Sequence, residues 1–172
     1  MSMLTDSRDA AKYGWTHCLT MPQSAWALGE ILPASSSNPS FRNQAARAAV
    51  SWVISLRAAV GNGRLNTNPE LKPIKLEIGY ALYESPAAAA AVAWHTAESD
   101  RLKLITTIAS EAAVRTDAHL IKFTRACIDS AIMDPEQARL YYAAAAYLCA
   151  IWCDEESRET IEDQRANGTQ RE

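Results

Sequence analysis

The sequence lacks the short motifs that mark the best-known catalytic sites. It has no GxGxxG or GxxxxGK phosphate-binding loop, no GxSxG nucleophile elbow, and no HExxH or ExxH metal motif. The sequence therefore gives no support for a nucleotide-binding fold or a serine hydrolase. If a metal site exists, the spacing of its ligands along the chain does not identify it. A nucleophile pair of Cys18 with His95 or His119 stays open, but it has no signature of its own.

The chain also lacks a large excess of charge and a long hydrophobic run. Its 172 residues carry a formal net charge of −3, which gives no electrostatic reason to expect nucleic acid or an anionic membrane as a partner. The longest apolar run, Leu140 to Cys153, covers only fourteen residues, which is too short to span a bilayer. It suits a central core helix instead.

Cysteine is scarce, and no CxxC pair occurs. The neighbours of Cys18, Cys127, Cys149 and Cys153 are mostly apolar, which is typical of buried reduced thiols rather than of a disulfide framework. The first residues, Met1 to Asp6, form neither a basic n-region nor an apolar h-region. Both observations favour a cytoplasmic protein.

Alanine is abundant, whereas alternating runs of β-branched residues are missing. Five alanines follow one another at Ala87–Ala91 and four at Ala143–Ala146. Because alanine is the best helix former and no strand pattern is present, the sequence predicts an all-α protein. We expect one domain of about six mostly antiparallel helices over residues 1–153. Residues 154–172 are expected to form a polar, solvated helix end and tail.

Proline and capping residues divide these helices. Thr20 with Pro22 predicts a new helix there, and Ser85-Pro86 and Asp134-Pro135 predict two more starts. A cap at Thr116 or Asp117 is one alternative for the following segment, and a helix that runs straight through to Ile132 is the other. Residues 64–75 are expected to form a loop that borders a pocket. The helix that follows Pro39 carries an apolar stripe of Val50, Val53, Ile54 and Ala58.

The chain has only three histidines, His17, His95 and His119, each among apolar or aromatic neighbours. One interpretation is that each imidazole lies in the core or at its boundary, hydrogen-bonded to a backbone carbonyl. The other is that the three converge from three helices into a metal site inside a bundle. In that case Lys122 is a candidate fourth ligand, as a neutral amine or as a CO₂ adduct.

Lys122 follows His119 at helical spacing, so both side chains lie on one face with Cβ atoms roughly 5–6 Å apart. If that face points inward, burial lowers the pKa of the lysine and a neutral amine can bind a metal. Otherwise the ammonium group reaches solvent along its methylene stem. The five tryptophans either pack in the core or line a pocket for a flat aromatic molecule.

Segment 117–124, Asp-Ala-His-Leu-Ile-Lys-Phe-Thr, is followed by a helix end at Asp134-Pro135 and an alanine-rich helix. This part of the chain, to Trp152, resembles the C-terminal part of questin oxidase-like proteins. Those proteins carry a similar His-x-Ile-Lys-Phe/Leu-Thr element before an alanine-rich final helix. Of the four candidate metal ligands, only His119 and Lys122 lie on this motif.

The resemblance implies an all-helical oxygenase that uses a non-heme metal, with iron as the expected cofactor. Its substrate would be an aromatic polyketide-type small molecule, into which it inserts oxygen or in which it cleaves a carbon–carbon bond. Family members are about twice as long as this chain. The alternative hypothesis is a catalytically silent helical protein with structural histidines. It would act by association, either as a homo-oligomer or with a larger partner subunit.

Overall fold

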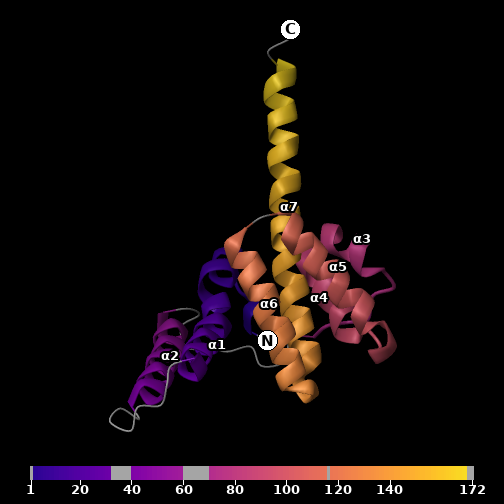
Figure 1. The fold of residues 1–172 in the computed structure, drawn as a ribbon. Coiled ribbons are helices and arrows are strands. Elements are labelled where there is room, and N and C mark those ends of the chain that lie inside the picture. Colours follow the sequence, from indigo (N-terminus) through magenta and orange to yellow (C-terminus); the bar gives the residue numbers. More distant parts are fainter. Residues whose placement is uncertain (1, 32–39, 60–69, 116, 170–172) are drawn as a thin grey trace.

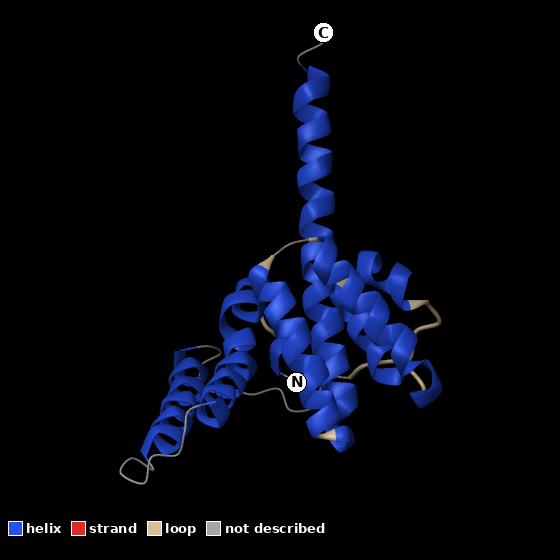
Figure 2. Cartoon of the chain, viewed as in Figure 1, coloured by secondary structure: helices blue, strands red, loops and turns tan. Residues whose placement is uncertain are grey.

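The protein is built from helices. A computed structural model describes residues 2–31, 40–59, 70–115 and 117–169, and these ranges contain seven α-helices and no strand (Figure 2). The helices are α1 Thr16–Ile31, α2 Ser40–Ala59, α3 Ile78–Glu84, α4 Pro86–His95, α5 Arg101–Val114, α6 Ala118–Met133 and α7 Ala138–Thr169. A 3₁₀ helix, η1 (Ser2–Thr5), and a π-helix, η2 (Ala10–Trp15), precede α1. The predicted all-α fold of a single domain is confirmed.

Helix α7 is the centre of the molecule. Its first part packs against α3, α4, α5 and α6, and Ala143, Ala146 and Ala150 are fully buried. Because alanine has only a methyl side chain, neighbouring helices approach α7 closely, and the prediction of a central alanine-rich core helix is confirmed. The C-terminal part of α7 extends alone away from the other helices (Figure 1). None of the described helices is long and apolar enough to cross a membrane.

The other helices form layers on the two sides of α7. On one side α6 packs on α7, α1 packs on α6, and α2 packs on α1 (Figure 1). On the other side lie α3 and α4, while α5 contacts both α6 and α7. Helix α2 is thus an outer layer whose main packing partner is α1, and much of its surface faces solvent.

Two of the predicted helix caps are present. The hydroxyl of Ser85 accepts a hydrogen bond from the Ala88 amide at 3.1 Å. One carboxylate oxygen of Asp117 accepts bonds from the amides of His119 and Leu120 at 2.8 and 2.9 Å. The cap at Asp117 decides between the two alternatives for this segment, since α5 ends at Val114 and α6 begins as a separate helix.

The prediction of a new helix beginning at Thr20 is wrong. Helix α1 runs through Pro22 without a break, and the Thr20 hydroxyl donates to the carbonyl of Thr16 at 3.0 Å instead of capping a new helix. A proline inside a helix removes one backbone hydrogen bond and costs roughly 3 kcal/mol. Packing of α1 between α2 and α6 compensates for that cost.

The predicted loop lies partly within the described residues. Residues 64–69 are outside them, and residues 70–77 have no regular secondary structure. Leu71, Lys72 and Ile74 line a hollow of about 400 Å³ together with residues of α4. The expectation that this loop borders a pocket is confirmed for its described part.

Candidate functional site

The structure separates His95 from the other two histidines. His95 ends α4, its side chain is exposed, and its Nε2 lies 2.7 Å from the carbonyl oxygen of Leu71. Since a carbonyl only accepts, Nε2 carries the proton and donates. Helix α4 packs on the side of α7 away from α1 (Figure 1). His95 therefore has the carbonyl partner of the first interpretation, but it lies on the surface and not in the core or at its boundary.

His17 and His119 are brought together. Their ring centres lie 6.1 Å apart and their planes meet at 56°. His17 is half-buried on α1, whereas the side chain of His119, in the first turn of α6, is 45% exposed. Tyr13 lies edge-on to His119 at 5.6 Å, and Trp52 lies 5.9 Å from His17. We call these four rings the histidine cluster; it joins η2, α1, α2 and α6.

Lys122 is not part of this cluster's interior. Its side chain is exposed, so the structure shows the second of the two alternatives, a lysine that reaches solvent and does not point inward. The reason is the rotation of α6, which turns Leu120, Phe123 and Cys127 toward the core and leaves position 122 on the solvent side.

The lysine that the fold buries is Lys12, which is 8% exposed. Its ammonium donates to a carboxylate oxygen of Glu155 at 2.5 Å and lies 4.5 Å from the centre of the Trp152 ring. Burial by itself lowers the pKa of Lys12, but the hydrogen bond and the charge of Glu155 outweigh it, so the pKa is raised. Lys12 stays charged and cannot serve as a neutral ligand or nucleophile.

The described residues do not fit the non-heme iron centre that the resemblance implies. Among them, no three His, Cys, Asp or Glu side chains gather closely enough to hold one ion. The carboxylate nearest to His119 is Asp117, whose Oδ1 is 4.0 Å from Nδ1 and already accepts two backbone hydrogen bonds. A metal that supports oxygen chemistry in such enzymes commonly has two histidines and one carboxylate, and here the carboxylate is engaged elsewhere.

The prediction of buried, unpaired thiols is confirmed for three of the four cysteines. All four are free; Cys127, Cys149 and Cys153 are buried and Cys18 is half-buried. Burial raises the pKa of the Cys18 thiol. Because the thiolate is the reactive form, this shift works against the nucleophile pair that the sequence left open.

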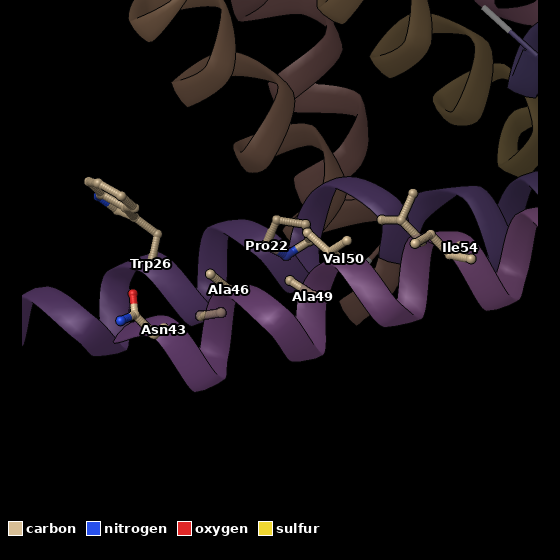
Figure 3. A pocket seen from close by; sticks show the side chains of 9 residues that line it. Pro22, Trp26, Asn43, Ala46, Ala49, Val50 and Ile54 are labelled. Atoms are coloured by element: carbon tan, nitrogen blue, oxygen red, sulfur yellow. The ribbon is translucent and has the colours of Figure 1, made fainter. Parts of the chain in front are cut away.

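A groove that was not predicted from the sequence lies between α1 and α2 (Figure 3). Its volume is about 560 Å³, and none of the described residues that line it is charged. The lining residues are Pro22, Ala25, Trp26, Asn43, Ala46, Ala49, Val50, Val53 and Ile54. Three of them are large and mostly exposed: Trp26 at 65%, Val50 at 58% and Ile54 at 62%. The stripe of Val50 and Ile54, one turn apart, was the sequence signal for this surface.

Scans against protein families, curated proteins and solved structures find no significant match to this chain. The resemblance of segment 117–124 to questin oxidase-like proteins therefore stays a prediction.

Proposed function

We propose that this chain is a self-associating helical protein and that two copies meet through the groove between α1 and α2. The observation that supports this function is the exposure of Trp26, Val50 and Ile54 around an uncharged groove. Soluble monomers rarely expose contiguous apolar patches of several hundred Å², and larger patches mark interaction sites. Association would remove these three side chains from water.

The shape of the groove suits a second copy of the same chain. Trp26 and Asn43 lie at one end of the groove and Ile54 at the other, with Pro22, Ala49 and Val50 between them (Figure 3). A two-fold axis through the middle of the groove would place Trp26 of each copy against Ile54 of the partner subunit. This is the self-complementary contact that a symmetric dimer requires.

Charge and area are compatible with a dimer of modest affinity. The described residues that line the groove are uncharged, so they bring no like charges together. Trp26, Val50, Ile54 and the small residues between them offer on the order of 400–500 Å² per copy, or about 1,000 Å² in total, which is near the lower limit of specific interfaces. We therefore expect a dissociation constant in the micromolar range.

The oxygenase hypothesis would give the groove another occupant. Its volume of about 560 Å³ falls within the range of small-molecule sites, so an aromatic ligand is the competing outcome. A metal-dependent enzyme would also need ligands beyond the two clustered histidines. Self-association needs only the surface that the described residues already present.

The test is sedimentation equilibrium of the wild-type chain and of Ile54→Glu at several concentrations. The wild type should shift from a monomer of 18.8 kDa toward a dimer as concentration rises, and Ile54→Glu should remain monomeric because its carboxylate would be buried without a partner. Ser55→Glu is the matched control, since Ser55 is exposed on α2 and does not line the groove. It should still dimerise.

Circular dichroism should show the same helix content for all three proteins. A wild type that stays monomeric at several hundred micromolar would refute self-association, and so would an Ile54→Glu variant that dimerises as well as the wild type. If the wild type stays monomeric and binds an apolar aromatic dye, and Ile54→Glu loses that binding, the groove is a small-molecule site.

A further inference from the structure

The spacing of His17 and His119 is close to that of two imidazoles that share one metal ion. With metal–nitrogen bonds of roughly 2.0–2.1 Å in tetrahedral geometry, two such rings have centres roughly 5 Å apart, and the separation grows as the N–metal–N angle opens. The observed separation is 6.1 Å. The side chain of His119 is 45% exposed, so a bound ion would have to draw its ring closer to that of His17.

The tautomer of His17 is set by Thr16. The buried hydroxyl of Thr16 donates its only proton to the carbonyl of Lys12 at 2.7 Å. The same oxygen lies 3.3 Å from Nδ1 of His17, so toward the ring it can only accept. Nδ1 must then carry the imidazole proton, and Nε2 keeps a free lone pair, which is the state a metal needs.

His119 has a weaker support, which is electrostatic because 4.0 Å is too long for a hydrogen bond. The Asp117 carboxylate oxygen lies 4.0 Å from its Nδ1 and favours a proton on that nitrogen. A carboxylate or hydroxyl behind the non-coordinating nitrogen is the usual arrangement around metal-binding histidines, where it fixes the ring and the tautomer. Each ring is thus supported by residues close to it in the sequence. The His17 ring is supported from η2 and α1, and the His119 ring from the start of α6.

We propose that His17 and His119 form a two-histidine site for a divalent transition-metal ion of the Zn²⁺, Ni²⁺ or Cu²⁺ class. The ion ties α1 to α6 through two Nε2 atoms, and water fills its remaining positions. Neutral imidazole donors suit these metals, whereas an all-oxygen set would suit Mg²⁺ or Ca²⁺. The site uses no groove residue. The metal-site proposal therefore goes beyond self-association, and a test of one does not decide the other.

The first experiment is calorimetric titration of the full chain with Zn²⁺ at pH 7.5, in a Cys18→Ser background that removes the nearest thiol. One ion should bind per chain with a micromolar dissociation constant. His17→Ala and His119→Ala should each weaken binding at least tenfold. His95→Ala is the matched control, because His95 is exposed and remote, and it should bind like the parent.

Thermal melting provides a second measurement. Zn²⁺ should raise the melting temperature of the parent and of His95→Ala, and it should leave that of His119→Ala unchanged. The exposed position of His119 keeps the substitution from disturbing the fold. A parent protein that takes up no zinc, or a His95→Ala variant that loses as much binding as His119→Ala, would overturn the proposal.

The orienting groups give a test that a random surface pair of histidines would not pass. Asp117→Asn and Thr16→Val should weaken Zn²⁺ binding about tenfold or more, as is usual for the second layer of a metal site. Apo-protein melting curves show whether each variant is folded. Unchanged affinity in both folded variants would refute the orientation argument and reduce the pair to a chance contact.

Discussion

At the scale of single residues, the packed end of α7 is held by three consecutive carboxylates. The pairs are Arg8 with Asp154, Lys12 with Glu155 and Arg115 with Glu156. The side chains of Asp154 and Glu155 are only 29% and 33% exposed. The prediction that this acidic run is fully solvated is therefore wrong at those two positions, because cations from distant segments pack over them.

Lys12 is the member of this set whose loss should cost most. Lys12→Met keeps an apolar stem but leaves Glu155 without its partner and removes the contact with the Trp152 ring, so we expect a loss of about 2 kcal/mol in the free energy of unfolding. Urea denaturation measures it. Lys122→Met is the control and should change stability by less than about 0.5 kcal/mol, since Lys122 is exposed. Equal losses would contradict the burial of Lys12.

The same pair gives this prediction a pH dependence. The pKa of Lys12 is raised in the folded protein, so its contribution is complete below the unfolded pKa of about 10.4 and is lost as pH rises through the folded value. The stability difference between wild type and Lys12→Met should be constant from pH 7 to about 9.5 and should shrink above it. Taking the difference cancels tyrosines and cysteines that titrate in both proteins.

At the scale of elements, the side-chain amide of Gln23 makes a polar contact between α1 and α6. The side-chain nitrogen of Gln23 donates to the carbonyl of Ala126 at 2.8 Å and to the hydroxyl of Ser130 at 2.6 Å. These bonds join α1 to α6. Because both acceptors lie at a partly buried boundary, removing the donor leaves them poorly solvated.

We expect Gln23→Ala to lower the free energy of unfolding by about 1–2 kcal/mol. Hydrogen exchange should quicken in α1 and α2 more than in α4 and α7. Ser24→Ala, at an exposed neighbouring position, is the control and should be neutral or slightly stabilising, since alanine is the better helix former. Exchange that quickens uniformly over all helices would show that the α1–α6 contact has no local role.

At the scale of the whole molecule, the packed part of α7 ends shortly after its ion pairs. Cys153 is the last buried residue among those described, and the pairs reach Glu156. A chain ended after Ser157 should melt within about 2 °C of the full chain, because the removed segment extends away from the other helices (Figure 1). A chain ended after Cys153 should lose about 3 kcal/mol, since three ion pairs disappear and Lys12 stays buried without a partner.

Differential scanning calorimetry of the two shortened chains tests the boundary. If the chain that ends at Ser157 melts as low as the one that ends at Cys153, the distal part of α7 contributes packing beyond its ion pairs. The predicted boundary between 153 and 154 would then be misplaced by more than three residues.

The helices and most of their ends could be predicted from the sequence, because they depend on local chemistry. Alanine runs favour helix wherever they occur, and Ser85 and Asp117 cap the helices that follow them through bonds that span three residues or fewer. Pro22 was the exception. Its local signal was overruled by the packing of α1 against two neighbours, which no short window of sequence contains.

The sequence by itself thus determined the all-α class, the central alanine-rich helix and the candidate histidines. Only the tertiary structure decided which of those candidates meet. His17 and His119 come together because α1 packs on α6, whereas His95 is held by Leu71 on the other side of α7. The rotation of each helix about its own axis is set by the sum of its contacts, and that sum buried Lys12, exposed Lys122 and left Val50 and Ile54 on the surface.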